Sequence, residues 1–254
     1  MNLIALPAFT DNYIWMLHDG RRAIVVDPGD AAPVLQALAS EQLTLVGILV
    51  THHHQDHTAG LSGLRSVSKG PVWGPARESI ASPVVPVGEG DTLSLLGHAW
   101  TVLDIPGHTS GHVAYFSELG GEPVVFCGDT LFSAGCGRLF EGTPEQMWAS
   151  LKRLAALPSD TRLCCGHEYT LANLAFAQAV EPDNQDVAEH MVWCQKTREQ
   201  QLPTLPSSVE RELRINPFLR VHVAGVIQQA LQHGAQGTDG VQVFAALRQW
   251  KNMF

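Results

Sequence analysis

The segment Val46–His57 restricts the possible folds most strongly, because an apolar run ends there directly in a cluster of polar side chains. Its first five residues, Val-Gly-Ile-Leu-Val, have the composition of a buried strand. The cluster that follows contains His52, His54, Asp56 and His57. In a sheet covered by helices, ligands gather at the carboxyl ends of strands. The segment therefore predicts a functional site at the edge of such a sheet.

The spacing within this cluster indicates metal binding. His52 and His54 are two residues apart, so in extended backbone both side chains project to the same side and reach one cation. Asp56 and His57 follow after a turn, which presents them to a second position beside the first. No covalent catalytic dyad needs four such groups in six residues. The segment predicts a pair of metal ions.

Three further candidate ligands share one local pattern, an apolar strand that runs into a glycine immediately before the polar residue. They are His108, Asp129 and His167. The glycine permits a tight turn and a close approach of the backbone to a buried cation. Burying five imidazoles and two carboxylates together without a cation would leave large desolvation costs uncompensated. The remaining histidines need no common explanation, and His53 and His112 stay open.

Strands and helices alternate over the first two thirds of the chain, which predicts an α/β fold. Strands are expected at 3–6, 13–17, 23–26, 46–50, 100–105, 113–116, 124–126 and 162–164. Helices are expected at 31–40 and 144–156, the second beginning with a capping box of Thr143 and Gln146.

Beyond about residue 170 the strand signals end and helical patterns follow one another. Helices are expected at 171–180, 186–201, 208–214, 223–233 and 240–250. Ser207 and Glu210 predict a capping box for the third of them. We therefore expect two domains, a catalytic domain at 1–170 and a smaller helical substrate-binding domain at 171–254.

Composition excludes several classes of partner and environment. The chain of 254 residues has 25 acidic residues against 16 Lys and Arg, a formal net charge of -9, which disfavours nucleic acid and anionic membrane surfaces. The beginning of the chain lacks a basic signal-peptide region, and no apolar stretch approaches the length of a membrane span. Five Cys without a C-x-x-C pair favour a reducing compartment. We expect a monomer in the cytoplasm.

The motif Thr51-His-x-His-x-Asp-His57, with the later Gly-His, Gly-Asp and Gly-His pairs, resembles the metallo-β-lactamase superfamily over about residues 1–170. The whole chain is similar to the hydroxyacylglutathione hydrolase (glyoxalase II) family. That narrower similarity depends on Cys136–Thr143, Gly166–Thr170, Asn216–Arg220 and a helical tail ending in Arg248 and Lys251. The resemblance implies an αββα metallo-β-lactamase sandwich with a smaller all-helical C-terminal domain.

The resemblance also implies the role of each candidate ligand. One metal would be bound by His52, His54 and His108, and the other by Asp56, His57 and His167, with Asp129 and a hydroxide bridging them. Nitrogen and oxygen ligands fit two divalent ions, zinc first, with iron or manganese as alternatives. Asp27 either orients a ligand imidazole or caps the turn before Pro28.

The implied reaction is hydrolysis of an S-(2-hydroxyacyl)glutathione thioester, typically S-D-lactoylglutathione, to glutathione and a 2-hydroxy acid such as D-lactate, the second step of methylglyoxal detoxification. The bridging hydroxide would attack the thioester carbonyl, with Asp56 and Asp129 as catalytic carboxylates. Four side chains would bind the glutathione part: Arg138, Tyr169, Arg248 and Lys251. Phe140 departs from the Tyr of some family members, which leaves one contact open.

Three other functions remain possible from the sequence. A mononuclear-iron dioxygenase acting on glutathione persulfide would share the fold, although the tail with Arg248 and Lys251 argues against it. A β-lactamase or lactonase is disfavoured by the same tail and by the lack of a secretion signal. The last alternative is a metal-stabilised binding module without turnover.

Overall fold

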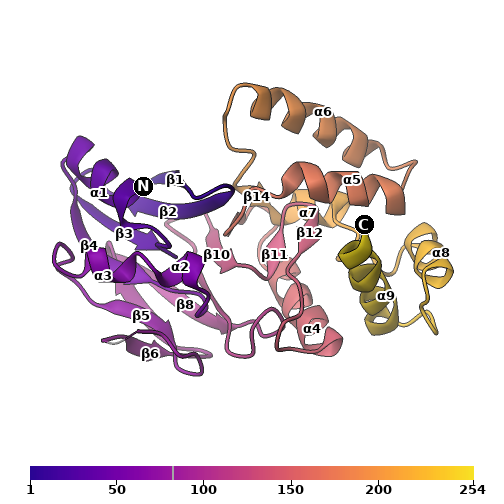
Figure 1. Cartoon of the computed structure of the whole chain (residues 1–254), viewed down its shortest axis with the longest axis horizontal. Helices are drawn as coiled ribbons and strands as arrows, with labels where there is room; N and C mark the ends of the chain where they lie inside the picture. Colours follow the sequence, from indigo (N-terminus) through magenta and orange to yellow (C-terminus); the bar gives the residue numbers. More distant parts are fainter. Residues whose placement is uncertain (82) are drawn as a thin grey trace. The chain divides into compact units, whose positions relative to one another are not determined.

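The structure, a computed structural model, describes residues 1–81 and 83–254 (Figure 1). The chain forms two compact units. The first unit consists of Met1–Asp104, Ser110–Gly128 and Cys164–His167, and the second consists of Ile105–Thr109, Asp129–Leu163 and Glu168–Phe254. These segments alternate along the sequence, so the expected division into 1–170 and 171–254 stays a prediction.

One sheet of the first unit has the strand order β1-β2-β3-β4-β5-β6. Its strands are β1 Asn2–Ala8, β2 Asn12–His18, β3 Arg22–Val26, β4 Thr44–Leu49, β5 Val72–Pro75 and β6 Val85–Val87. The first three strands pair antiparallel, and β3 to β6 pair parallel. In the parallel half, the carboxyl ends of the strands lie at one edge of the sheet. The histidine cluster follows β4 and therefore lies at that edge.

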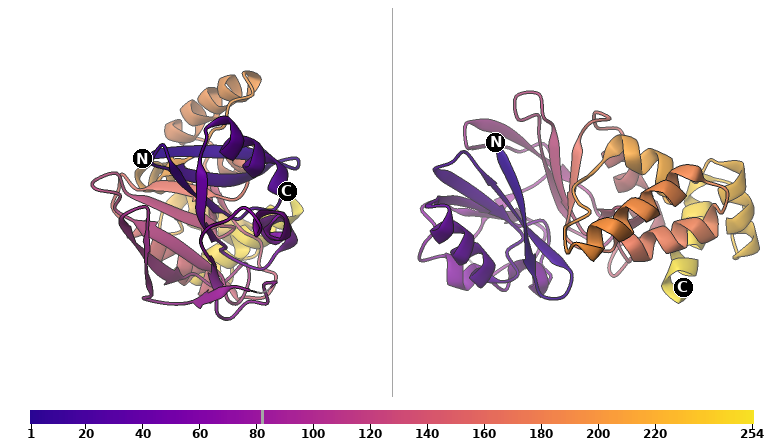
Figure 2. Two further views of the ribbon diagram at one scale, coloured as in Figure 1. Left: turned by 90° about the vertical axis from the view of Figure 1, so that its left-hand side faces the viewer. Right: turned by 90° about the horizontal axis from the view of Figure 1, so that it is seen from above.

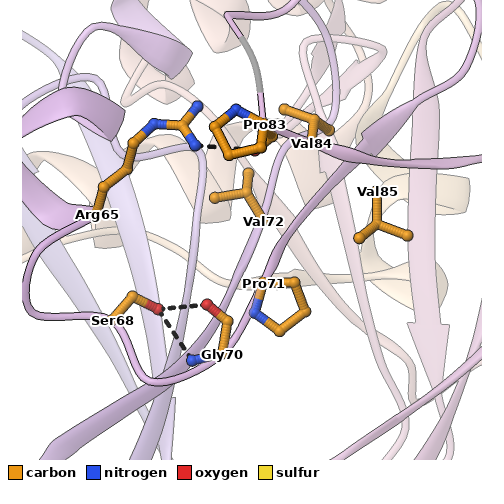
Figure 3. A pocket seen from close by; sticks show the side chains of 8 residues that line it. All are labelled: Arg65, Ser68, Gly70, Pro71, Val72, Pro83, Val84 and Val85. Carbon is orange, nitrogen blue, oxygen red and sulfur yellow. Dashed lines mark hydrogen bonds between the residues drawn. The ribbon is translucent and has the colours of Figure 1, made fainter.

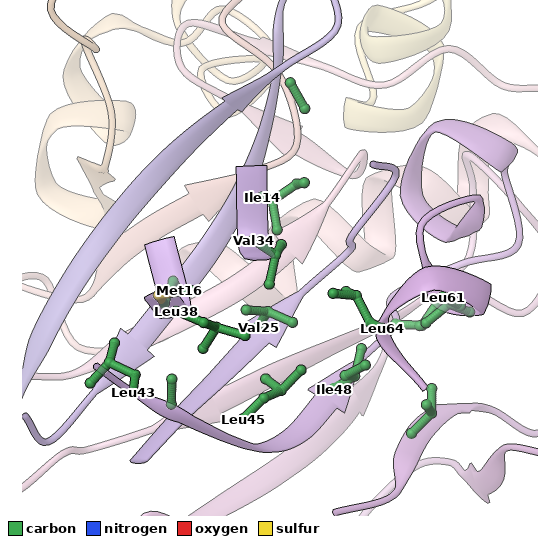
Figure 4. Packing of buried hydrophobic residues seen from close by; sticks show 14 residues of the cluster. Ile14, Met16, Val25, Val34, Leu38, Leu43, Leu45, Ile48, Leu61 and Leu64 are labelled. Atoms are coloured by element: carbon green, nitrogen blue, oxygen red, sulfur yellow. The ribbon is translucent and has the colours of Figure 1, made fainter. Parts of the chain in front are cut away.

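Helix α1, Ala31–Ser40, covers one face of this sheet (Figure 4). Its buried residues Val34 and Leu38 pack in a cluster with side chains of β2, β3 and β4, among them Ile14, Val25 and Ile48. Each buried side chain of this size contributes roughly 1.5–3 kcal/mol to stability. The short helices α2, Gln55–Thr58, and α3, Leu61–Leu64, follow β4. The sheet therefore provides a rigid support for the residues at its carboxyl edge.

A second group of strands in the first unit pairs antiparallel in the order β7-β8-β9-β10. These are β7 Thr92–Leu95, β8 His98–Asp104, β9 Val113–Ser117 and β10 Val124–Gly128. Trp100 and Phe126 stack in its core with ring centroids 5.4 Å apart. Strand β13, Arg162–Cys165, ends in this unit and leads to His167.

The second unit is mainly helical. It contains α4 Pro144–Ala155, α5 Thr170–Val180, α6 Gln185–Glu199, α7 Val209–Ile215, α8 Ala224–Gln232 and α9 Gly240–Met253. It also holds three two-residue strands, β11 Leu131–Phe132, β12 Gly135–Cys136 and β14 Ser207–Ser208. Helices α5 and α6 lie side by side, as Figure 1 and the right-hand view of Figure 2 show. None of the described helices is long and apolar enough to cross a membrane.

Most expected elements are confirmed, including α1 and the capping box of Thr143 and Gln146 on α4. The predicted capping box of Ser207 and Glu210 is wrong by one residue. Ser208 is the N-cap of α7 and accepts from the Arg211 backbone N–H at 3.2 Å. Ser207 instead donates to the Glu212 carboxylate, because β14 turns its side chain toward the interior. Strands β5, β6 and β7 and the short helices α2 and α3 were not predicted, since each is only three or four residues long.

Candidate metal centre

Three imidazoles converge where the chain leaves β4 in the first unit. His54 is the N-cap of α2, so the backbone turns between His52 and the helix that carries Asp56 and His57. His52 Nε2 lies 3.1 Å from His54 Nδ1, and the His52 and His57 ring centroids are 4.2 Å apart. His52 and His57 are buried, whereas His54 is half-buried. The clustering of histidines in the sequence thus becomes a clustering in space.

A second group unites Asp56 and His57 with His167, which is more than a hundred residues away in sequence. The Asp56 Oδ2 atom lies 3.4 Å from Nε2 of each imidazole. His167 reaches this position because the Tyr13 backbone N–H donates to Gly166 O at 2.8 Å, which aligns the end of β13 with β2. One ligand atom from each of the three residues lies within 4.8 Å of the others. This is the spacing needed for atoms that share one cation.

The charge of Asp56 is strongly favoured in this arrangement. Hydrogen bonds from the His167 and His57 imidazoles hold the pKa of its carboxyl well below the ordinary value, against the opposing effect of burial. The Asn12 amide adds a third hydrogen bond, Nδ2 to Oδ2 at 3.0 Å. Asp56 is therefore a carboxylate, the protonation state that a metal ligand requires.

Asp27 connects this group to the end of β4. Its carboxylate accepts from the Thr51 backbone N–H and the Thr51 hydroxyl, both at 2.7 Å. It also lies 3.1 Å from His57 Nδ1. Asp27 therefore contacts an imidazole and holds the backbone immediately before His52. The alternative role, capping the turn before Pro28, stays a prediction.

Sequence reasoning missed two polar residues where β1 connects to β2, Asp11 in the turn and Asn12 at the start of β2. Asp11 Oδ1 lies 2.8 Å from His167 Nδ1, and Asn12 donates to Asp56. Carboxylates placed behind a ligand imidazole fix its tautomer and raise its basicity. The signal available in the sequence was a polar Thr-Asp-Asn turn at the end of an apolar strand.

Glu78 was also missed. Its buried carboxylate accepts from the His53 backbone N–H at 2.7 Å and from the Gly111 backbone N–H at 2.9 Å, and it contacts the His53 imidazole. It thereby ties two loops of the first unit together. The two histidines left open by the sequence flank the cluster, because His53 binds Glu78 and His112 stacks on His52 with ring centroids 4.6 Å apart.

Gly128, which ends β10 immediately before Asp129, has the conformation that its place in the sequence predicts. Its φ of +47° lies in the left-handed region, and a Cβ there would be 2.3 Å from Thr51 Oγ1. A side chain at this position would therefore collide with the turn that leads into the histidine cluster.

His108 and Asp129 lie together in the second unit. His108 Nε2 is 3.5 Å from Asp129 Oδ2, and both residues are buried. His108 Nδ1 faces the Arg138 carbonyl oxygen at 2.9 Å, so that nitrogen carries the proton and Nε2 is left with a lone pair, the form that a metal ligand requires.

The predicted substrate cations also belong to the second unit. Arg248 on α9 is only 5% exposed, and it donates to Cys136 O at 2.7 Å and Asn252 Oδ1 at 3.1 Å. Lys251 Nζ donates to Ala172 O at 2.9 Å and lies over the Phe176 and Phe254 rings. Burial, together with the positive charges of Arg248 and Arg138, lowers the pKa of Lys251 to about 8.

Two aromatic residues complete the description of this region. Tyr169 precedes α5, is 37% exposed and packs edge-on against Phe132 at 5.2 Å. Phe140 is 63% exposed and packs edge-on against the His108 imidazole at 5.2 Å. The exposed phenyl ring beside the His108 imidazole presents an apolar surface where a Tyr would present a hydroxyl.

A separate pocket of about 290 Å³ lies in the first unit (Figure 3). Arg65 closes one side by donating to Pro83 O at 2.9 Å, and Ser68 donates to Gly70 O at the same distance. The described residues that line it include no His, Cys, Asp or Glu. We therefore assign no chemistry to this pocket.

The fold and the imidazole–carboxylate clusters define a metallo-β-lactamase-type metalloprotein. Residues 8–167 match the family described as "Metallo-beta-lactamase superfamily", and residues 168–254 match "Hydroxyacylglutathione hydrolase C-terminus". A hydroxyacylglutathione hydrolase of Albidiferax ferrireducens is 58% identical over 255 residues, covering 100% of both chains. The chain belongs to the hydroxyacylglutathione hydrolase family, as the motifs in its sequence predicted.

Two solved structures share the fold. The crystal structure of ETHE1 from Myxococcus xanthus matches with a TM-score of 0.67 and 25% identity, covering 100% of this chain and 99% of that one. The crystal structure of TTHA1623 in a di-iron-bound form matches with a TM-score of 0.60 and 28% identity, covering 86% of this chain and 100% of that one. The predicted metallo-β-lactamase fold with an additional helical region is confirmed.

The donor set fits metal ions. Imidazole nitrogens and carboxylate oxygens suit zinc, iron and manganese, and the pairing of Asp11 and Asp27 with ligand imidazoles is typical of metal sites in proteins. The fold and these clusters support a site for two divalent metal ions.

Proposed function

We propose that the protein hydrolyses S-(2-hydroxyacyl)glutathione thioesters, typically S-D-lactoylglutathione, to glutathione and a 2-hydroxy acid such as D-lactate. The observation that carries this proposal is the grouping of Asp56, His57 and His167 beside His52 and His54, in a chain that matches its family over its full length. A monomer in the cytoplasm stays a prediction, as does a role in methylglyoxal detoxification.

Zinc is the proposed metal at both positions. His52 and His54 with His108 would bind one ion, and Asp56 and His57 with His167 the other, with Asp129 shared between them. The chemistry that two divalent ions would supply there is acidification of a shared water, which would provide hydroxide near neutral pH, and polarisation of a carbonyl oxygen. Asp11 and Asp27 face Nδ1 of the His167 and His57 imidazoles, which leaves Nε2 of each ring on the side of Asp56.

The remaining chemistry is binding and departure of the thiol. We propose that Arg138, Lys251 and Arg248 attract the two carboxylates of the glutathione part, with a hydrogen bond from Tyr169. The leaving thiolate has a conjugate acid with a pKa of roughly 8.5, so it departs without a general acid. No serine nucleophile is needed, and the sequence contains no G-x-S-x-G elbow.

We expect the KM for the thioester to rise above pH 8. Lys251 has a pKa of about 8, so its ammonium is present below that pH and is lost above it. If the charge binds a substrate carboxylate, KM should increase about three- to tenfold between pH 7 and pH 9. Lys251→Arg keeps its charge throughout and should flatten this rise. An equal rise in KM for both proteins would contradict the assignment of Lys251.

We expect the purified, zinc-loaded protein to hydrolyse S-D-lactoylglutathione. The reaction is measured as the decrease in absorbance of the thioester. Dipicolinate should abolish the activity and added Zn²⁺ should restore it, because hydroxide formation depends on the metal. Oxygen uptake measured on the same sample, with glutathione persulfide as substrate, tests the dioxygenase alternative. The proposal fails if protein containing two metal ions does not cleave the thioester, or if it consumes oxygen instead.

A further inference from the structure

A short hairpin in the second unit lies between two residues of the proposed site. Strands β11 and β12 pair Leu131 with Cys136 and Phe132 with Gly135, and Ser133 and Ala134 form the turn. Asp129 precedes the hairpin by two residues and Arg138 follows it by two. Its placement therefore sets the distance between a proposed metal ligand and a proposed substrate cation. Two pairs of residues are too few to stabilise a hairpin by themselves.

The turn of this hairpin is held by a buried carboxylate. Glu212 on α7 is 0% exposed, and its Oε2 atom accepts from the Ala134 backbone N–H at 2.7 Å. Its Oε1 atom accepts from the Ser207 hydroxyl at 2.5 Å. Ala134 has a φ of +54°, an unfavourable conformation for alanine that this hydrogen bond helps to maintain. The carboxylate thus fixes the tip of the hairpin in one backbone conformation.

Two asparagines bind the carbonyl groups around the same turn. Asn216 Nδ2, one helical turn beyond Glu212, lies 3.2 Å from Phe132 O and 3.0 Å from Gly135 O. Asn173 on α5 donates from Nδ2 to Ser133 O at 3.0 Å. The asparagine lies so close that a Cβ on Gly135 would be 2.4 Å from this Nδ2 atom. Both asparagines are buried, so these hydrogen bonds lie in the interior and do not compete with bulk water.

The open end of the hairpin is bound from a third helix. Arg248 on α9 donates to Cys136 O at 2.7 Å, and the Gly137 backbone N–H donates to Thr130 O at 3.1 Å. Helices α5, α7 and α9 therefore each contribute at least one polar side chain to six residues of chain. Replacing a buried carboxylate by an apolar residue of similar size often leaves the stability of a protein unchanged. The specific effect of the Glu212 carboxylate is to orient the Ala134 backbone N–H, which donates to it.

We propose that Glu212 is a positioning residue of the active site, acting with Asn173 through the β11–β12 hairpin on Asp129 and Arg138. The inference depends on the proposed function, because that function places Asp129 at the metal ions and Arg138 at the substrate. No contact of Glu212 with substrate is involved. Its effect passes through the backbone of residues 131–136, which it holds at Ala134.

The first test measures Zn²⁺ affinity of the folded protein by competition with a chelating indicator. Glu212→Leu and Asn173→Ala should each weaken the weaker of the two zinc sites about tenfold or more, the size typical of losing a group behind a ligand. Glu212→Gln retains an oxygen acceptor for Ala134 and should stay within about threefold of the natural protein. Because no substrate is present, this measurement is independent of whether the thioester is cleaved.

Glu181→Leu is the matched control. Glu181 is a nearly buried carboxylate in the same unit and is paired with Arg220 at 2.7 Å. Within the part of the chain that the structure describes, the hydrogen bonds of its carboxylate are with Arg220 and not with the hairpin. The Glu181→Leu substitution should lower the melting temperature and leave the zinc affinity unchanged. In thioester hydrolysis, the Glu212→Leu and Asn173→Ala proteins should show a lower kcat and a higher KM together, since both Asp129 and Arg138 move.

The inference is overturned if folded Asn173→Ala and Glu212→Leu bind zinc as tightly as the natural protein. It is also overturned if Glu181→Leu weakens zinc binding as much as they do, which would indicate general destabilisation. If Glu212→Leu does not fold, Asn173→Ala decides alone. If the natural protein binds zinc but does not cleave the thioester, the proposed function is refuted. The effect of the hairpin on zinc affinity would be unaffected by that outcome.

Discussion

Asp129→Ala is expected to lower kcat for thioester hydrolysis by about 10²- to 10³-fold, the loss seen when one preorganised group is removed from an active site. Asp129 is buried, and its carboxylate lies 3.5 Å from His108. As the proposed ligand shared by both metal ions, it is the single side chain whose loss affects both. Metal analysis should therefore show fewer than two zinc ions per chain, together with the loss of activity.

Asp104→Ala provides the control for this experiment. Asp104 is also an aspartate near the end of a strand, but it pairs with the exposed guanidinium of Arg77. Such a pair contributes about 0–1 kcal/mol to stability, and its removal should leave kcat and metal content unchanged. Full activity of Asp129→Ala with two bound zinc ions would show that Asp129 is not a shared ligand.

Asp27→Ala is expected to lower the free energy of unfolding by about 3–5 kcal/mol and the affinity for zinc by about 10- to 100-fold. The carboxylate accepts two hydrogen bonds from Thr51 and contacts His57 Nδ1, and all three residues are buried. Each donor left unpaired in the interior costs about 1–3 kcal/mol. Denaturant unfolding and chelator competition would measure the two effects separately.

Asp30→Ala isolates the effect on the metal site. Asp30 lies three residues further along the same loop and caps α1, its carboxylate accepting from the Ala32 backbone N–H at 2.9 Å. Loss of such a cap costs about 1 kcal/mol and should not change zinc affinity. Asp27→Asn keeps the shape of the side chain, and its zinc affinity should lie between those of Asp27→Ala and Asp30→Ala. Unchanged zinc affinity in Asp27→Ala would refute the role of Asp27 in orienting His57.

Much of the site could be predicted because its chemistry is concentrated in short segments. His52, His54, Asp56 and His57 are within six residues, so their proximity in space follows from chain connectivity alone. Gly128 immediately before Asp129 predicts a tight turn, because glycine adopts a positive φ without steric cost. The capping box of α4 was predictable for the same reason, since all of its hydrogen bonds join residues three apart.

Contacts between distant parts of the chain could not be predicted in this way. The Asp11–His167 pair joins residues 156 apart in sequence, and the bond from Ala134 to Glu212 joins residues 78 apart. Neither Asp11 nor Glu212 belongs to a periodic pattern or a motif in the sequence. An isolated Asp or Glu is most often a solvated surface residue. The placement of the cap at Ser208 rather than Ser207 likewise depends on the pairing of β14 with β13.

The sequence by itself determined the family, the kinds of ligand atom and the strand that carries most of them, because these depend on residue type and local spacing. Only the tertiary structure decided which carboxylates lie behind the imidazoles and which side chains hold the hairpin between Asp129 and Arg138. The physical reason is that a buried hydrogen bond is specified by the packing of whole elements against one another. Asp11 and Glu212 acquire their roles only when β2 meets the end of β13 and α7 meets the hairpin.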